Sequence, residues 1–302
     1  MATSNSKSTV ILAFSVNLFI ALIKFFIWGI TGSSAFFSEA IHSVVDSSNQ
    51  AMLWYGQTQS GSGPNAKYPL GRGKEEYFWA LVVAVVFFTL GGIVSLQHGL
   101  EALSHPKKLE NLPISIAVLV FSILLETYVL IKATKEIKKG EKKNSKIMRL
   151  LRKSTDGSLV AIIVEDFAAT LGLIIALIGV SLSYFTGNSL YDGASSILIG
   201  ILLMVSGLFL GYEMKHLIVG ESVDPSIKKS IYELINNYEG IKKIIQIDIV
   251  VIGKDAYLLL GNIDYHDKLD DMQISEINNQ LFDQIKKEHP KVSDIFINTV
   301  SD

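Results

Sequence analysis

The stretch Ser38-Glu-Ala-Ile-His-Ser-Val-Val-Asp-Ser-Ser-Asn-Gln50 places polar and ionisable residues inside an otherwise apolar segment. Glu39, His42 and Asp46 are separated by three and four residues. On an α-helix this spacing puts them on one face, each one turn from the next. Ionisable groups at membrane depth are costly, and by default they face a bundle interior or a water-filled cavity and mark an ion or proton path. An imidazole and a carboxylate four residues apart can also share a metal ion.

The composition decides between a membrane helix and the polar face of a soluble helix. The 302 residues are 49% hydrophobic and 19% charged, with a mean hydropathy of +0.37, whereas soluble domains carry about 25% charged residues. The apolar runs come first, which predicts a transmembrane domain at 1–220 and a cytoplasmic domain at 221–302. The net charge of −2 gives no indication of a nucleic-acid partner. Without cysteine, the available strong metal ligands are His, Asp and Glu.

Six apolar segments are long enough, or nearly so, to cross the hydrocarbon layer, which takes about 20 helical residues. They predict a membrane α-helical bundle with six transmembrane helices, at 9–30, 35–55, 77–103, 113–133, 157–185 and 190–216. The last of these contains seven Gly and Ser residues between 193 and 211. Small residues let membrane helices approach closely, so we expect the sixth span to pack tightly against its neighbours.

The Lys and Arg residues of the short loops predict the orientation. The connection at 132–153 contains eight Lys and two Arg, and the loop after the second span adds Lys67, Arg72 and Lys74. The turns after the first and fifth spans contain none. We therefore expect both termini in the cytoplasm, with the chain in the plasma (inner) membrane if it is bacterial. The polar first ten residues predict no removable signal peptide.

The last 80 or so residues have the pattern of a small α/β domain. Helical periodicity at 226–238 and 271–289 and alternation at 244–252, 257–265 and 295–300 give the order αββαβ. This order predicts a two-layer, ferredoxin-like or metallochaperone-like domain with its helices on one face of the sheet. The open sheet face and edge would suit pairing with a second copy of the chain.

Two adjacent acids, Glu165 and Asp166, lie within the apolar fifth span. Adjacent helical positions are about 100° apart, so both can point partly toward one neighbouring helix. A purely structural role would need intramembrane cations, and Lys24 in the first span is the one clearly available. These acids are therefore predicted to share a metal site with His42 and Asp46 of the second span.

The predicted ligand set is His42, Asp46 and Asp166, with Glu165 as the fourth candidate. One nitrogen and several oxygens suit tetrahedral Zn²⁺, and the weight of carboxylates also suits Mn²⁺ or Fe²⁺. Glu39, one turn from His42, could be a further ligand, a partner that orients the imidazole, or a carboxylate on the entry path.

With these motifs the chain resembles the cation diffusion facilitator family of zinc transporters. The matching features are His42-Ser-Val-Val-Asp46, Pro69-Leu-Gly-Arg-Gly-Lys74, Asp166, the Gly-Tyr-Glu213 exit from the last span, six spans and the αββαβ tail. The family's transport site pairs two residues four apart on span two with two more, four apart, on span five. Here the first of the latter pair falls on Ile162. The Glu-Asp pair resembles a branch that includes mitochondrial and bacterial members.

The resemblance implies a secondary active transporter rather than an enzyme. The transporter is expected to be a homodimer that exports a divalent metal from the cytosol across the lipid bilayer in exchange for protons. The expected metal is Zn²⁺, and no cofactor is expected beyond the transported ion. A Mn²⁺ or Fe²⁺ exporter of the same family is the alternative. Metal binding needs a neutral imidazole and ionised carboxylates, so protonation favours release.

Two hypotheses belong to other classes. An intramembrane metallohydrolase could use the same residues around a metal-bound water, although the chain has no His-Glu-x-x-His pattern. A metal sensor or scaffold could work through the tail. There Asn298 occupies a strand where metal-binding family members carry His and Asp, and we expect His266 and Asp267 to be ordinary surface residues.

Overall fold

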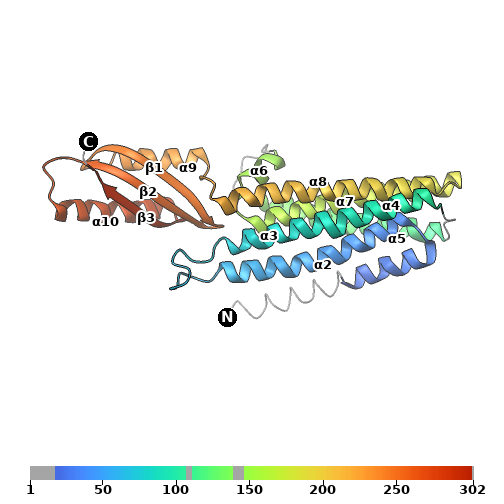
Figure 1. Cartoon of the computed structure of the whole chain (residues 1–302). Coiled ribbons are helices and arrows are strands. Elements are labelled where there is room, and N and C mark those ends of the chain that lie inside the picture. The colour runs from blue at the N-terminus through green and yellow to red at the C-terminus, as the bar shows by residue number, and fades with distance from the viewer. Residues whose placement is uncertain (1–17, 107–110, 139–145, 301–302) are drawn as a thin grey trace. The chain divides into compact units, whose positions relative to one another are not determined.

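The computed structural model describes residues 18–106, 111–138 and 146–300 and divides into two compact units (Figure 1). The helical unit comprises Met1–Thr58 and Glu76–Lys215, and the tail unit comprises Gln59–Glu75 and His216–Asp302. The domain boundary at 220 stays a prediction.

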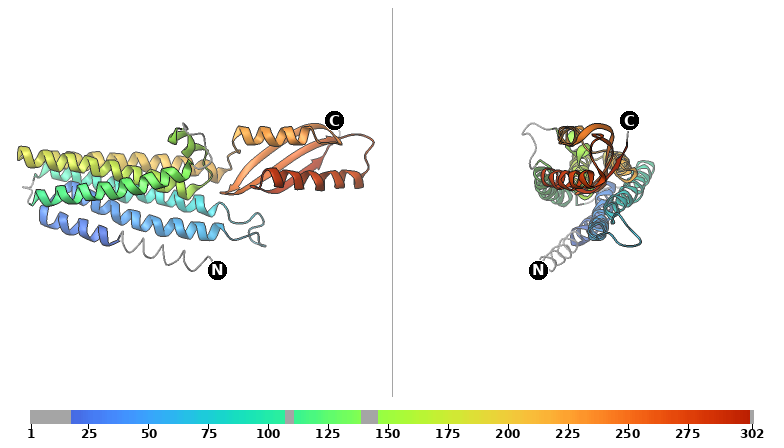
Figure 2. Two further views of the ribbon diagram at one scale, coloured as in Figure 1. Left: turned by 180° about the vertical axis from the view of Figure 1, so that it is seen from behind. Right: turned by 90° about the vertical axis from the view of Figure 1, so that its left-hand side faces the viewer.

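The helical unit is built from long helices that run alongside one another (Figures 1 and 2). In chain order the helices of this unit, long and short, are an initial helix at Leu18–Thr31, α2 (Ser34–Ser60), α3 (Glu75–Val86), the π-helix η1 (Phe87–Ile93), α4 (Val94–Ser104), α5 (Leu112–Ile137), α6 (Ile147–Lys153), α7 (Gly157–Thr186) and α8 (Leu190–Val219). The helices α3, η1 and α4 follow one another without a break.

Among the described residues, four helical stretches are long and apolar enough to cross a membrane. They correspond to the predicted third to sixth spans and are Glu75–Ser104, Pro113–Ile137, Gly157–Thr186 and Leu190–Val219. The predicted first span begins at residue 9, so part of it lies outside the described residues, and the rest is the short apolar helix Leu18–Thr31. The predicted second span is α2, which carries the polar stretch. Six transmembrane helices therefore stay a prediction.

The small residues of α8 allow α4 and η1 to approach closely, as their sequence predicts. A Cβ added to Gly200 would lie 2.7 Å from the backbone nitrogen of Leu96 and 2.9 Å from the carbonyl oxygen of Gly92. Real Cβ atoms do not approach other atoms so closely, and this contact therefore requires glycine.

Asp192 joins the start of α8 to the start of α2. Its carboxylate accepts hydrogen bonds from the Ser33 hydroxyl (2.5 Å), the Ser34 backbone N–H (2.5 Å) and the Ser34 hydroxyl (2.7 Å). Asp192 is buried. The first N–H groups of a helix have no partner within the helix, so this carboxylate caps α2 from another helix.

Two features of the helical unit differ from the sequence-based expectation. We expected a loop from residue 56, but α2 continues to Ser60. Gly56 fits within the helix because its bare Cα packs against Trp79, where an added Cβ would lie 2.9 Å from the Trp79 Cβ. The short helix α6 in the Lys-rich connection was also not predicted, since it is only seven residues long.

The tail unit has the predicted αββαβ order: α9 (Pro225–Asn236), β1 (Ile241–Gly253), β2 (Ala256–Tyr265), α10 (Asp271–Glu288) and β3 (Val292–Thr299). The sheet order is β1-β2-β3, with β1 antiparallel and β3 parallel to β2. Helix α9 packs on β1, α10 packs on β3, and the two helices touch each other, so they cover the same face. The small C-terminal sheet domain is thus confirmed.

Hydrogen bonds fix the local geometry of this unit. Asp270 and Gln273 form a reciprocal capping box at the start of α10. The Tyr265 hydroxyl donates to the Asn278 side chain, which ties β2 to α10. Burial raises the pKa of the Tyr265 phenol, although the hydrogen bond to Asn278 acts in the opposite direction. On the open face of the sheet, Asp248, Leu260 and Phe296 lie in register across the three strands.

Candidate metal site

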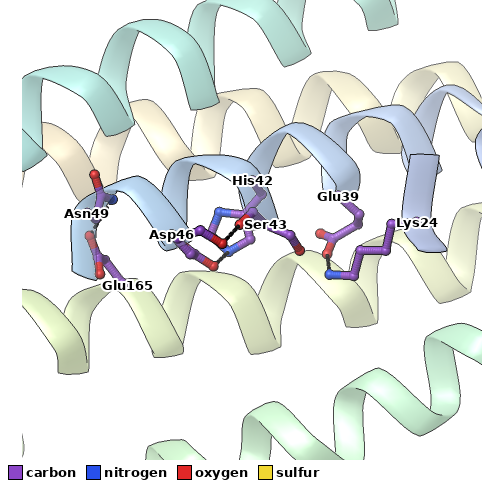
Figure 3. Close-up of polar contacts among 8 residues, drawn as sticks. Lys24, Glu39, His42, Ser43, Asp46, Asn49 and Glu165 are labelled. Carbon is purple, nitrogen blue, oxygen red and sulfur yellow. Dashed lines mark hydrogen bonds and ion pairs between the residues drawn. The ribbon is translucent and has the colours of Figure 1, made fainter. Parts of the chain in front are cut away.

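His42 and Asp46 form the centre of the polar stretch on α2 (Figure 3). The Nε2 atom of His42 lies 3.4 Å from Oδ2 of Asp46, as expected for helical neighbours four residues apart. The imidazole is 1% exposed, and its ring centroid lies 5.4 Å from that of Phe87 in η1. The predicted span-two pair is therefore assembled by one helix and held in place by an aromatic neighbour.

Glu165 approaches α2 one turn further along the stretch. The Asn49 side-chain amide donates a hydrogen bond of 2.6 Å to Oε1 of Glu165, and both residues are buried (Figure 3). The contact links α2 to α7 across 116 positions in the sequence. Asn49 was not among the predicted site residues, and the signal for it was its position in the same helical series as His42 and Asp46.

Asp166, the neighbour of Glu165, is half-buried on α7. Its Oδ2 atom is buried and has no hydrogen-bond partner among the described residues. Asp166 acts electrostatically on Asp46, and Glu126 on α5 acts on both. Glu126 was not among the predicted site residues, although it is an acid within the predicted fourth span.

Glu39 pairs with Lys24 and not with His42. Its Oε2 atom lies 3.3 Å from the Lys24 ammonium, and the two side chains are 1% and 2% exposed. Gly172 on α7 leaves room for this carboxylate, since an added Cβ would lie 2.9 Å from Oε1 of Glu39. Lys24 was expected as the one cation available to Glu165 and Asp166. In the structure it contacts Glu39 instead.

Several polar atoms of this region have no protein partner within the part of the chain that the structure describes. These atoms accept or donate no hydrogen bond within that part: Nδ1 and Nε2 of His42, Oε1 of Glu39, Oδ1 of Asp46, Oδ1 of Asn49 and Oδ2 of Asp166. The 3.4 Å contact of Nε2 with Asp46 is an ion-pair distance and not a hydrogen bond. Buried polar atoms without partners are costly, so the arrangement favours a polar or charged ligand. In the described residues, however, no three His, Asp or Glu side chains are grouped closely enough to hold a metal ion together. A shared ion would require the α2 pair and the α7 acids to close around it.

The fold and the polar stretch define the class of the protein: an integral membrane helical bundle with a buried His and carboxylate centre and a small α/β tail. A model of the cation efflux transmembrane domain matches residues 10–218. Because this match covers more than half of the chain, the chain belongs to the cation efflux family, the cation diffusion facilitators. The family resemblance seen in the sequence is confirmed.

Individual relatives agree with this assignment. The chain is 31% identical over 284 residues to the human protein "Proton-coupled zinc antiporter SLC30A9, mitochondrial", which covers 94% of this chain and 50% of the relative. It is 29% identical over 266 residues to metal tolerance protein C4 of Arabidopsis thaliana, covering 88% and 58%. Magnetosome protein MamM of Paramagnetospirillum magneticum is 35% identical over 98 residues, 32% of this chain and 30% of the relative. The chain spans about half the length of the first of these curated relatives.

Proposed function

We propose that the chain is a secondary transporter that moves Zn²⁺ out of the cytosol in exchange for protons. The observation that carries the proposal is the His42–Asp46 pair of α2, in which His42 is buried and Asp46 is 18% exposed, with Glu165 held by Asn49 one turn further along. Membership of the cation efflux family and the similarity to a protein named as a proton-coupled zinc antiporter support it.

The proposed ligands are His42, Asp46 and Asp166, with Glu165 completing the set. A neutral imidazole and three carboxylates match the nitrogen and oxygen donors that Zn²⁺ accepts at four positions. The unpartnered atoms of His42, Asp46 and Asp166 are the ones that an ion could bind without breaking an existing hydrogen bond. Glu165 already holds Asn49 through Oε1, so its second oxygen is the proposed donor.

Proton exchange follows from the chemistry of the same residues. Imidazole and carboxylate groups bind a metal only after they have lost their protons, so loading an ion displaces protons and protonation displaces the ion. Alternation of the site between the two sides of the membrane would then couple the two movements. Glu126, which acts electrostatically on Asp46 and Asp166, adds a further carboxylate to this group.

The topology that accompanies this function is also a proposal. It has six transmembrane helices, with the helix at Leu18–Thr31 and α2 added to the four apolar stretches, and both termini in the cytoplasm. The chain would act as a homodimer through its tail, where Leu260 and Phe296 form an exposed apolar row on the open sheet face. Family membership favours transport over the metallohydrolase and sensor hypotheses.

Transport in proteoliposomes tests the proposal. Full-length protein should take up Zn²⁺ in response to an imposed pH gradient, and the His42→Ala, Asp46→Ala double variant should lose this uptake. The matched control is His266→Ala, Asp267→Ala, which removes the same two residue types from the exposed surface of the tail. Uptake by the first variant equal to that of the control would refute the site assignment. Parallel uptake of Mn²⁺ and Fe²⁺ decides whether Zn²⁺ is the preferred ion, and uptake that ignores the gradient would refute proton exchange.

A further inference from the structure

Lys24 is a positive charge in the interior of the helical unit. Among the predicted spans it is the one Lys or Arg that lies more than one turn from a span end, because Lys132 and Lys215 each lie within one turn of an end. Its side chain is 2% exposed. An ammonium group at membrane depth is expensive without a counter-charge, so its position in the sequence implies an acidic partner within reach.

That partner is Glu39, which faces Lys24 from the neighbouring helix (Figure 3). The 3.3 Å contact joins the initial helix to α2 one turn before His42. It also places a fixed positive charge at one end of the candidate metal site, and Lys24 acts electrostatically on His42 and Asp46 as well. One lysine therefore influences three groups of the polar stretch.

The contact bears on whether Glu39 can be a metal ligand. To bind an ion beside His42 through Oε2, Glu39 would have to break its contact with Lys24. The buried Lys24 ammonium would then have no counter-charge. Breaking a buried pair in this way is strongly unfavourable. Oε1 of Glu39 has no hydrogen-bond partner among the described residues, but it packs against Gly172 of α7.

We propose that Lys24 is a resident counter-ion of the transport site: it holds Glu39 out of the ligand set and lowers the affinity of the site for a divalent cation. The inference rests on the proposed function, because it concerns the affinity of that same site. The positive charge opposes a second cation nearby, and such a site releases its ion more readily than one lined by acids alone. Lys24 is thus a positioning residue that acts through Glu39 and through its charge.

The sign of the effect separates this role from a purely structural one. Lys24→Met removes the positive charge and releases a carboxylate, so Zn²⁺ should bind more tightly than in the wild type, by about tenfold. Glu39→Gln leaves the ammonium charge without its counter-charge, so Zn²⁺ should bind more weakly by a similar factor. The double variant should lie between the two single variants, because the two sites are coupled.

The measurement is equilibrium Zn²⁺ binding to the full-length protein in detergent at pH 7, by competition with a fluorescent chelator. Ser47→Ala is the control, since it removes a buried hydroxyl of α2 that donates to the carbonyl of Ser43 and changes no charge. If Lys24→Met does not fold, Lys24→Gln removes the charge and keeps a hydrogen-bond donor for Glu39. Tighter binding is expected there too.

Each outcome has a distinct meaning. Weaker or unchanged Zn²⁺ binding in the lysine variant would overturn the counter-ion role, as would unchanged binding in Glu39→Gln. A wild-type protein that binds Zn²⁺ while the variants do not differ from it would refute this inference and leave the proposed function standing. A wild-type protein that binds and transports no divalent metal would refute the proposed function itself.

Discussion

The hydrogen bond between Asn49 and Glu165 gives the sharpest test of the fourth ligand. Asn49→Leu keeps the approximate volume of the side chain and removes the donor of the 2.6 Å bond to Oε1 of Glu165. Both side chains are buried between α2 and α7. If Glu165 binds the ion through its second oxygen, loss of this bond leaves the carboxylate free to turn away, and the affinity for Zn²⁺ should fall.

The size of the effect can be bounded. A hydrogen bond to a charged group contributes about 1.5–3 kcal/mol in soluble proteins, but in membrane proteins the average is about 0.6 and the maximum about 1.7 kcal/mol. The membrane values correspond to about a 3- to 20-fold change in an equilibrium constant. Groups that orient metal ligands typically change metal affinity about 10- to 100-fold. We therefore expect roughly tenfold weaker binding.

The assay is Zn²⁺ binding to the purified full-length protein, followed by initial uptake rates in proteoliposomes over a range of Zn²⁺ concentrations. Ser48→Ala is the matched control, because this neighbouring hydroxyl donates to the carbonyl of Val44 within α2. The control should bind as the wild type does. An Asn49→Leu protein whose affinity stays within about twofold of the wild type would refute the role of Asn49 and weaken the case for Glu165 as a ligand.

Three further predictions concern stability. Gly200→Ala should lower the melting temperature of the detergent-solubilised protein, since overpacking costs about 1–3 kcal/mol, whereas Gly29→Ala, with nothing within 4 Å of its added Cβ, should change it little. Asp192→Ala should destabilise the bundle by about 1–3 kcal/mol because it leaves the buried Ser34 N–H and hydroxyl unpaired, and thermal unfolding equal to the wild type would contradict this. Burial raises the pKa of Tyr265 in the folded protein, so the protonated phenol stabilises the fold fully below the ordinary pKa of about 10. This stabilisation is lost as the pH rises through the raised pKa of the folded state. The melting temperature of the tail unit should therefore fall less above about pH 10 in the Tyr265→Phe protein than in the wild type.

Contacts within one helix were predictable from the sequence. The pairing of His42 with Asp46 follows from their spacing of four residues, and the tail elements follow from periodicity. The partners of Glu165 and Glu39 were not predictable in this way. They depend on which helices are neighbours and on the rotation of each helix about its axis, and neither property is encoded in the spacing along one segment.

The π-helix η1 illustrates a second kind of difference. Its seven residues, Phe87–Ile93, read as ordinary parts of an apolar span, and their composition does not separate π from α hydrogen bonding. Such π segments occur often at functional sites. Here η1 supplies Phe87, whose ring lies beside the His42 imidazole. The shift in register was invisible in the sequence, although its consequence lies at the centre of the candidate site.

Three contacts follow one another along α2, spaced by about one turn each, so that the stretch from Glu39 to Asn49 covers about 15 Å. The outer two, Lys24–Glu39 and Asn49–Glu165, join α2 to other helices, whereas the middle one, His42–Asp46, lies within α2. An ion that displaced either outer contact would also separate two packed helices. An ion that takes both groups of the middle pair leaves those contacts between helices intact. This difference favours the middle pair as the place where an ion is loaded and released repeatedly, with the outer contacts holding the helices that surround it.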